Sequence, residues 1–213
     1  PEPLVTNADI EKLVDTSDEW IRSRTGLRER RLAADGETTG DLAFRAAQQA
    51  LQDAGVKASD LDMVVLGTTT PDIIFPATAC LIQDRLGANG CMAFDVNAAC
   101  SGFVYALGVA NNFVRTGQVK RALVMGAETL TRMVDWSERE TCVLFGDGAG
   151  AVVLEASDEP GILATCLHAD GGYKDLLYNP VGVSVGFKDE KNHGVRIKMR
   201  GREVFKVAVK TLD

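Results

Sequence analysis

Cys100 lies where a strand-like pattern passes into a helix-like one. The apolar residues Met92, Phe94 and Val96 alternate before it, and apolar residues recur at helical spacing over residues 101–117. The N-terminus of a helix has unpaired N–H groups and a positive dipole end, which favour a thiolate over a thiol. A thiolate is a strong nucleophile, so Cys100 is a candidate to accept an acyl group covalently. A free cysteine among small residues is also common in protein cores, and the local pattern leaves both interpretations open.

A second candidate for chemistry is the segment 22–31, which holds five arginines in ten positions. In an acidic protein such a cluster suggests an anionic ligand, because guanidinium groups bind phosphate in a bidentate manner. Trp20 lies just before the segment and can stack on a flat ring. The alternative interpretation is a solvated basic surface beside a packed tryptophan.

The elements that position these residues alternate between strand and helix patterns. Short continuous apolar runs predict buried strands, and apolar residues at helical spacing predict amphipathic helices. The predicted strands are 63–67, 91–96, 122–126 and 151–155, and the predicted helices are 7–14, 19–24, 39–54, 77–86 and one that begins at 101. This alternation predicts βαβ units and a sheet covered by helices on both faces.

The segment Phe145–Gly150 has spaced glycines that invite comparison with a dinucleotide-binding loop. Such a loop follows a strand and opens a helix, whereas these glycines run into the predicted strand 151–155. The dinucleotide interpretation is therefore rejected. We expect the glycines to allow close backbone approach beside the reactive centre.

Composition and charge restrict the class of protein. The 213 residues suit one large domain or a domain and a half, and 46% hydrophobic with 25% charged residues is typical of soluble globular proteins. The net charge of −7 and pI near 5.0 speak against nucleic acid as the main partner. No apolar run approaches the roughly 20 residues that span a bilayer. The five scattered cysteines (80, 91, 100, 142 and 166) predict reduced thiols and a cytoplasmic protein.

Several short motifs at consistent spacing make the chain resemble the ketoacyl-acyl-carrier-protein synthase III family, the condensing enzymes that initiate bacterial fatty acid synthesis. The motifs are Asp15–Ile21 with Arg24–Gly26, Phe75–Pro76, Asp95–Phe103, Phe145–Gly150 and His168–Gly171. The resemblance covers the whole chain and implies a thiolase-like α/β fold with layers in the order α/β/α/β/α, here mainly its N-terminal half. It implies that residues 1–156 form that half and that residues 157–213 are the connection and the start of the C-terminal half.

The resemblance also implies roles for individual residues. Cys100 matches the family's acyl-accepting nucleophile. Trp20 and Arg139 match the pair that sandwiches the adenine of coenzyme A, and Arg24 and Thr25 match residues near the nucleotide and the pantetheine. These roles are chemically sensible, since an aromatic ring and a guanidinium plane both bind a π-face and cationic donors bind phosphates.

Apolar residues are implied at the acyl-binding end of the site. Phe75 resembles the residue that reaches across a homodimer interface to shape the partner's acyl pocket. The residues that match the substrate tunnel are Leu144, Phe145, Met199 and Phe205. A leucine or methionine at such a spacing is also common in an ordinary core, so the structural interpretation stays open for these.

The chain departs from the family pattern in one respect. The family's nucleophile works with a histidine and an asparagine from the second half of the fold, and neither motif is in this sequence. Of the two histidines present, His168 is expected to have a structural role at the end of a strand, and His193 is expected to lie in an exposed loop, residues 188–194. The chain begins at Pro1 and ends at Asp213 within a helical pattern, so we expect it to be part of a longer enzyme.

For the complete enzyme, the resemblance implies an acyltransferase that moves a short acyl group from acyl-CoA to Cys100 and then condenses it with malonyl-acyl-carrier protein. It implies a homodimer and no metal, redox group or other cofactor. Because the carrier protein is acidic, its docking surface is expected to be basic. One candidate is the helical segment with Arg200, Arg202, Lys206 and Lys210, for which a solvated helix face is the competing interpretation.

Two other functions remain open at this point. A related thiolase-fold condensing enzyme of a polyketide or quinolone pathway would share Cys100 and differ in its tunnel residues. A non-enzymatic half-fold would act only as a binding piece, and it would gain no mass from acetyl-CoA.

Overall fold

The computed structural model describes residues 1–187 and 196–212, which divide into two compact units. Unit 1 comprises Pro1–Glu2, Ala33–Thr129 and Asp147–Leu167, and unit 2 comprises Pro3–Leu32, Leu130–Gly146 and the described part of His168–Asp213. The units interleave along the chain. The expected ranges 1–156 and 157–213 concern the halves of a longer fold, and that division stays a prediction.

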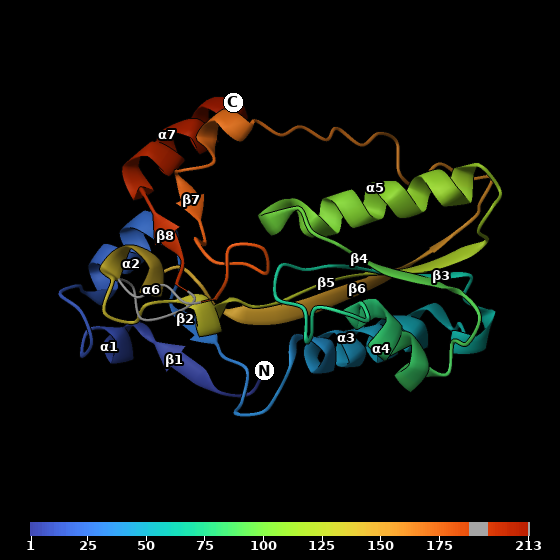
Figure 1. Ribbon diagram of the computed structural model, residues 1–213, viewed down its shortest axis with the longest axis horizontal. Helices are drawn as coiled ribbons and strands as arrows, with labels where there is room; N and C mark the ends of the chain where they lie inside the picture. The colour runs from blue at the N-terminus through green and yellow to red at the C-terminus, as the bar shows by residue number, and fades with distance from the viewer. Residues whose placement is uncertain (188–195, 213) are drawn as a thin grey trace. The chain divides into compact units, whose positions relative to one another are not determined.

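A four-stranded sheet forms the centre of unit 1 (Figure 1). Its strands, in spatial order, are β4 (Met92–Val96), β3 (Met63–Gly67), β5 (Arg121–Thr129) and β6 (Asp147–Glu155). β3 runs parallel to both β4 and β5, and β6 runs antiparallel to β5. β3, α4 and β4 form one βαβ unit, and β4, α5 and β5 form a second one whose strands lie on either side of β3. These are the βαβ units that the sequence predicts.

Helices cover both faces of this sheet (Figure 1). α3 (Thr39–Ala54) and α4 (Thr78–Leu86) lie on one face, and α5 (Gly102–Arg115) lies on the other. Successive side chains of a strand point to opposite faces, and those of β3 enter the two apolar cores in alternation. All of β3 is therefore buried, as its continuous apolar run predicts.

α5 packs against β3 at a point of very close backbone approach. A Cβ atom added to Gly67, the last residue of β3, would lie 2.4 Å from the carbonyl carbon of Gly102 and 2.6 Å from the nitrogen of Phe103. Backbone atoms cannot rotate out of the way as a side chain can, so only glycine fits at position 67. This contact sets the distance of the first turn of α5 from the sheet.

Of the glycines in Phe145–Gly150, only Gly146 shows the close backbone approach that the sequence suggested, since a Cβ added there would lie 3.3 Å from the carbonyl oxygen of Arg31. β6 begins at Asp147, so two of them lie within the strand rather than before it. Among the described residues, no atom lies within 4 Å of a Cβ added at Gly148 or Gly150. The strand starts early because its partner β5 extends to Thr129 and pairs with Asp147.

The ends of α3 are those that its sequence pattern predicts, and local hydrogen bonds explain both. The Thr38 hydroxyl accepts from the Asp41 N–H at 3.1 Å, and the Asp41 carboxylate accepts from the Thr38 N–H at 2.9 Å. This reciprocal pair is a capping box. Gly55, with a φ of 64°, ends the helix in the left-handed conformation.

Replacing Asp41 with asparagine is expected to destabilise the protein near neutral pH but not in acid. The hydrogen bond from the Thr38 N–H lowers the pKa of Asp41 below its ordinary value. Because the folded pKa is depressed, the stabilisation is present above the ordinary pKa and is lost as the pH falls through the folded one. The free energy of unfolding should fall by about 1 kcal/mol at neutral pH. Urea unfolding of the complete enzyme near pH 7 and at about pH 3 measures the free energy of unfolding of the variant and of the wild type. A difference between the two proteins that is the same at both pH values would contradict the capping role.

Unit 2 is built from short elements around a small apolar core. Its two antiparallel strand pairs are β1 (Leu4–Thr6) with β2 (Glu29–Arg31) and β7 (Leu177–Tyr178) with β8 (Lys198–Met199). Its helices are α1 (Asn7–Ile10), α2 (Asp18–Thr25), α6 (Arg139–Cys142) and α7 (Gly201–Leu212). Single 3-10 turns occur at Leu130–Met133 and Gly171–Tyr173 here, and at Ala58–Asp60 and Ala99–Ser101 in unit 1. The core residues are Ile10, Ile21, Val134, Cys142 and Val143.

Two expectations for these residues need correction. The helix predicted to reach Val14 ends at Ile10, and the chain continues as turns in which the N–H groups of Leu13 and Val14 both donate to the Ile10 carbonyl, at 2.9 and 3.1 Å. His168 is exposed and lies outside any strand, since the residues around it form no ladder with a described strand. The prediction for His193 and its loop falls outside the described residues.

Over the ranges that are described, no helix combines the length and apolar character needed to cross a membrane.

Candidate functional site

Cys100 sits in the tight connection between β4 and α5. β4 ends at Val96, one 3-10 turn spans Ala99–Ser101, and α5 begins at Gly102. The side chain of Cys100 is exposed to solvent, which argues against core filling as its role. The thiol therefore stands at the N-terminal end of a well-packed helix and can be reached from outside unit 1.

The turn that presents Cys100 is strained. Ala99 has a φ of 47°, the left-handed region that costs a non-glycine residue about 1–2 kcal/mol. The side-chain oxygen of Asn97 accepts from the Ala99 N–H at 3.4 Å, and the Ser101 N–H donates to the Ala98 carbonyl at 3.1 Å. The sequence pattern predicts a short turn here, but no glycine marks the position, so sequence reasoning missed the positive φ of Ala99. Strain of this kind often occurs where a reactive group has to be exposed on a turn.

The other cysteines have different surroundings. Cys142 belongs to the core of unit 2, and burial raises the pKa of its thiol. Cys80 and Cys91 are half-buried, and the Cys80 thiol donates to the Ala93 carbonyl at 3.4 Å. Cys166 is exposed like Cys100, but it lies in a segment without regular secondary structure. Cys166 is thus the best internal comparison for Cys100.

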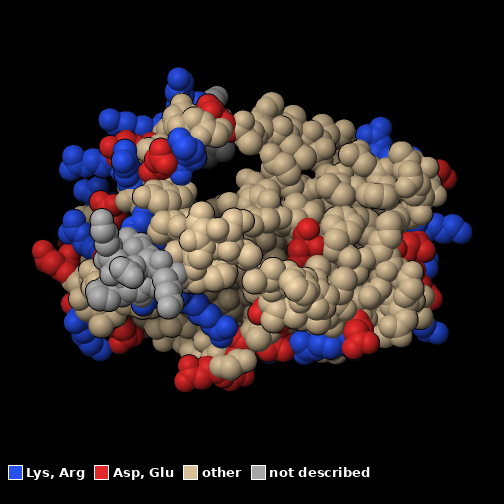
Figure 2. Space-filling view, viewed as in Figure 1, with Lys and Arg blue, Asp and Glu red and all other residues tan. Residues whose placement is uncertain are grey.

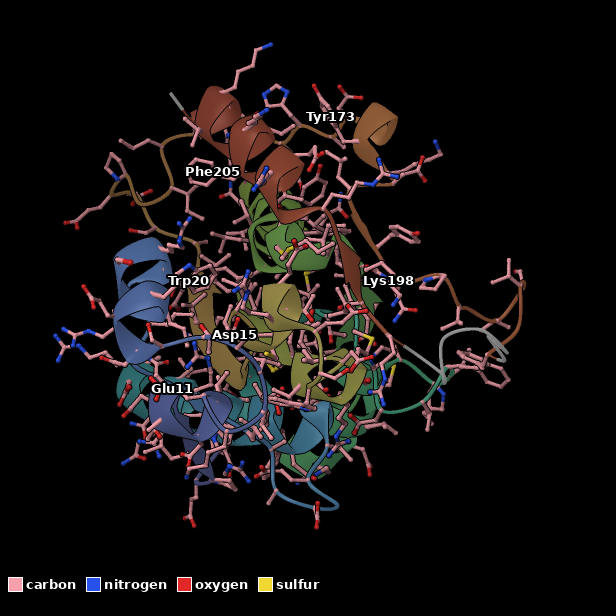
Figure 3. The ribbon with its side chains drawn as sticks, turned by 90° about the vertical axis from the view of Figure 1, so that its left-hand side faces the viewer. Glu11, Asp15, Trp20, Tyr173, Lys198 and Phe205 are labelled. Atoms are coloured by element: carbon pink, nitrogen blue, oxygen red, sulfur yellow. The ribbon has the colours of Figure 1, made fainter. Side chains whose placement is uncertain are left out.

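Trp20, Arg24 and Arg139 come together in unit 2, in a group that we call the tryptophan–arginine cluster. The guanidinium carbons of Arg24 and Arg139 each lie 4.9 Å from the centre of the Trp20 ring. Trp20 and Arg24 are one turn apart on α2, and Arg139 is the first residue of α6. Figure 3 shows Trp20 on α2 and Phe205 on α7, above it in this view. The structure therefore assembles three of the residues that the resemblance implied for nucleotide binding.

The spacing within the tryptophan–arginine cluster leaves no room for a ring between its planes. Two stacked contacts need about 7 Å, twice the carbon–carbon contact distance of ~3.5 Å, whereas Arg139 lies at 4.9 Å from the ring of Trp20. An adenine that binds between them therefore has to displace Arg139. This residue is exposed and donates from Nη1 to the Asp15 carbonyl at 3.1 Å, so the movement disrupts few contacts.

The remaining arginines of residues 22–31 do not all belong to one site. Arg22 and Arg28 line a pocket of about 520 Å³ together with Asp18, Glu19, Ser23 and Gly26. Arg30 is buried, and it donates from Nε to the Val143 carbonyl at 3.1 Å and from Nη1 to the Asn7 side-chain oxygen at 2.5 Å. Arg22 pairs with Asp18 at 3.3 Å. Arg30 therefore has a structural role, and the anionic-ligand hypothesis stays a prediction for the exposed arginines.

Thr25 uses its hydroxyl within the backbone of its own segment. The hydroxyl donates to the Ile21 carbonyl at 2.7 Å and accepts from the Leu27 N–H at 3.1 Å. These bonds close the last turn of α2. They do not show a contact with a ligand, so the pantetheine role of Thr25 stays a prediction.

The residues matched to the substrate tunnel lie in different surroundings within unit 2. Phe145 packs against the core, Leu144 is partly exposed, and Phe205 on α7 is 68% exposed. Met199 on β8 lines a pocket of about 480 Å³ that it shares with Arg139. The other lining residues are Glu138, Glu140, Asp175, Tyr178, Lys198 and Arg200. The structure places Met199 near the tryptophan–arginine cluster, and the tunnel itself stays a prediction.

Phe75 lies on an exposed apolar loop of unit 1. Ile73, Ile74 and Phe75 are 47%, 61% and 82% exposed, and three consecutive large apolar side chains on a surface suggest a contact with another chain. β4 is an end strand of the sheet order, with β3 as its neighbour. An edge strand of this kind offers backbone groups for pairing.

Charge is unevenly distributed over the surface in Figure 2. The surface over α5 shows almost no charged side chains, and Arg115 is the one charged residue in that helix. Lys and Arg gather over α7 (Figure 2), where Arg202, Lys206 and Lys210 follow one another at a spacing of four residues. Residues four apart share a helix face, so these three basic side chains lie on one face of α7.

No group of three or more His, Cys, Asp or Glu side chains within the described ranges is arranged to hold a metal ion.

Comparison with known proteins identifies the relatives of the chain. A family model described as 3-Oxoacyl-[acyl-carrier-protein (ACP)] synthase III matches residues 94–171, which include Cys100. A beta-ketoacyl-[acyl-carrier-protein] synthase III of Xanthomonas campestris pv. campestris (strain 8004) is 65% identical over 100% of this chain and 66% of that protein.

Solved structures similar to this chain belong to the same family of synthases. A 3-oxoacyl-[acyl-carrier-protein] synthase III from Aquifex aeolicus VF5 is 50% identical, with a TM-score of 0.88 over 97% of this chain and 63% of that one. A second solved 3-oxoacyl-(acyl-carrier-protein) synthase III is 32% identical, with a TM-score of 0.90 over 99% of this chain and 67% of that one. These matches confirm the thiolase-like α/β fold class. The present chain spans about two thirds of the length of its curated relatives. With sequence and backbone in agreement along its whole length, the chain belongs to the beta-ketoacyl-acyl-carrier-protein synthase III family.

Proposed function

We propose that the complete enzyme is an acyltransferase that starts fatty acid synthesis. It takes a short acyl group from acyl-CoA and condenses it, with loss of carbon dioxide, with malonyl-acyl-carrier protein. The single observation that carries the proposal is the exposed Cys100 on a strained turn at the N-terminus of α5, in a chain 65% identical to a beta-ketoacyl-[acyl-carrier-protein] synthase III.

The proposed first half-reaction uses Cys100 alone among the described cysteines. Its thiolate attacks the thioester carbonyl, the bond to the coenzyme A sulfur breaks, and an acyl-cysteine forms while coenzyme A leaves as a thiolate. Backbone N–H groups at the start of a helix point at a developing oxyanion there and stabilise it. In the second half-reaction, malonyl-carrier protein loses carbon dioxide, and the resulting carbanion attacks the acyl-cysteine to form the new carbon–carbon bond. Cys100 is released as a thiolate.

The tryptophan–arginine cluster is the proposed site for the nucleotide of coenzyme A. Trp20 offers a π-face for adenine, and the exposed Arg24 and Arg139 offer charge for its phosphates. The basic face of α7 is the proposed docking surface for the acidic carrier protein. No step of this chemistry calls for a metal, redox group or other cofactor.

The complete enzyme is proposed to be a cytoplasmic homodimer. The exposed loop around Phe75 and the edge strand β4 both support an interface with a second copy. The five cysteines, all free, are in keeping with a reducing compartment. In this proposal Phe75 shapes the acyl pocket of the partner subunit.

The test is product formation by the complete enzyme. Acetyl-CoA and malonyl-carrier protein are supplied, and the ketoacyl-carrier protein is measured together with the intact mass of the enzyme after acetyl-CoA alone. An enzyme that gains no acetyl group is a binding protein, and the proposal fails. Profiling a series of acyl-CoA substrates separates the proposed function from a polyketide or quinolone enzyme, which the identity of 65% to a beta-ketoacyl synthase does not favour.

Coenzyme A binding should weaken when the tryptophan–arginine cluster loses its charge. Arg24→Ala and Arg139→Ala are each expected to raise the dissociation constant for coenzyme A roughly tenfold or more, since a charge-assisted contact contributes about 1.5–3 kcal/mol. Isothermal titration with the complete enzyme measures the change. Arg115→Ala, which removes an exposed arginine from α5, is the matched control and should bind like the wild type. Unchanged affinity in both cluster variants would reassign these arginines to the solvated surface.

A further inference from the structure

The helix α4 begins without a capping side chain of its own. Its N-cap residue is Ala77, which makes no side-chain cap hydrogen bond. The first N–H groups of a helix have no partner within the helix, and Ser, Thr, Asp or Asn usually satisfies one of them from the N-cap position. The N–H groups of Thr78 and Ala79 therefore need an acceptor from elsewhere in the chain.

Asp95 of β4 supplies that acceptor. Its two carboxylate oxygens accept separately, one from the Thr78 N–H and the other from the Ala79 N–H, each at 2.8 Å. A negative charge at a helix N-terminus is also favoured by the helix dipole. Asp95 is partly buried, and burial raises the pKa of this carboxyl despite both hydrogen bonds. Asp95 therefore joins α4 to the strand that leads, five residues later, to Cys100.

The loop between β3 and α4 is fixed at its other end by Asp72. The Asp72 carboxylate accepts from the Gly40 N–H of α3 at 2.8 Å, and the Asp72 N–H donates to the Thr78 hydroxyl at 3.0 Å. A Cβ at Gly40 would lie 2.4 Å from an oxygen of Asp72, so a side chain there would displace the carboxylate. Both ends of the loop are thus tied down at Thr78, while residues 73–75 project outward.

We propose that Asp95 is a positioning residue that sets the place of the Phe75 loop relative to the nucleophile strand β4, and thereby the acyl-chain preference of the enzyme. The hydrogen bonds of Asp95 join the first two residues of α4, directly after the loop, to the strand before Cys100. The bond from the Cys80 thiol to the Ala93 carbonyl is a further and longer link between this helix and this strand. The inference rests on the proposed function, in which Phe75 shapes the acyl pocket of the partner subunit.

The test compares acylation of the complete enzyme by acetyl-CoA and by hexanoyl-CoA. Asp95→Asn keeps one acceptor and turns an amide N–H₂ toward the second backbone donor, so one of the two hydrogen bonds is lost. The ratio of the kcat/KM values for the two substrates should change roughly threefold or more, since pocket shape decides discrimination between chain lengths. Asp62→Asn is the matched control, because the Asp62 carboxylate also accepts from two backbone N–H groups, those of Lys120 and Arg121, which belong neither to α4 nor to the loop. It should leave the ratio unchanged.

A second variant separates positioning from simple helix stability. Ala77→Ser in the Asp95→Asn background gives α4 a local cap. It should restore the midpoint of urea unfolding while the altered substrate ratio persists. Recovery of the wild-type ratio together with stability would overturn the proposal and leave Asp95 as a cap only.

A double-mutant cycle with Phe75→Ala tests the route of the effect. If Asp95 acts through the Phe75 loop, Asp95→Asn should add little to the ratio already changed by Phe75→Ala. Fully additive effects would overturn the proposal. A wild-type enzyme that acetyl-CoA does not acylate would instead refute the proposed function, so the two failures are distinguishable.

Discussion

The Cys100→Ala variant of the complete enzyme should form no acyl-enzyme and should lose condensing activity roughly a thousandfold or more, which is typical when a covalent nucleophile is removed. Cys100 is exposed at the N-terminus of α5 on a strained turn, and no buried cysteine can reach a thioester in its place. Intact mass after incubation with acetyl-CoA measures the acyl-enzyme, and peptide mapping locates the acetyl group.

Cys166→Ala is the control for this prediction. Cys166 is also exposed but has no helix N-terminus beside it, so its loss should leave acylation unchanged. Brief labelling of the folded wild type with iodoacetamide should likewise modify Cys100 before Cys166. Labelling should be slowest at Cys142, where burial raises the thiol pKa. Acetylation of the Cys100→Ala variant, or equal labelling of all five thiols, would show that the turn does not activate Cys100.

The elements of the fold that could be predicted are those with local determinants. α3 and β3 have the bounds that the sequence suggests, because Thr38 and Gly55 mark the ends of the helix and a continuous apolar run defines the strand. β5 is longer than its apolar run because Glu128 and Thr129 continue the strand. Their polar groups are satisfied by distant residues: the Glu128 carboxylate accepts from the Thr69 N–H at 2.8 Å. No local pattern announces such a partner.

The candidate site shows the same division. The nucleophile could be found from the strand-to-helix pattern around Cys100, whereas the strain at Ala99 could not, because nothing in its residue type marks a positive φ. The stacking of Arg139 on Trp20 and the capping of α4 by Asp95 both join distant parts of the sequence. The resemblance to a family suggested that Arg139 and Trp20 lie close together. The hydrogen bonds from α4 to Asp95 are known only from the three-dimensional structure. Close backbone approach was expected along Phe145–Gly150. It occurs there at Gly146 but not at Gly148 or Gly150, and a much tighter approach occurs at Gly67, since steric need depends on what packs above a residue.

Replacing Gly67 with alanine should destabilise the complete enzyme by about 1–3 kcal/mol or more and slow acylation of Cys100. The new methyl group would lie 2.4 Å from the carbonyl carbon of Gly102, so α5 has to move away from β3. Because Cys100 belongs to the turn that opens α5, this movement displaces the thiol as well. Urea unfolding measures the first effect, and the rate of iodoacetamide labelling at Cys100 measures the second.

Gly161→Ala is the matched control for this substitution. Gly161 belongs to the same unit, and its added Cβ would meet no atom within 4 Å among the described residues. Alanine there should leave stability unchanged or raise it slightly, because it reduces the entropy of the unfolded chain. A Gly67→Ala enzyme with wild-type stability and wild-type labelling would mean that α5 tolerates the extra carbon. The contact between β3 and α5 would then not be what holds Cys100 in place.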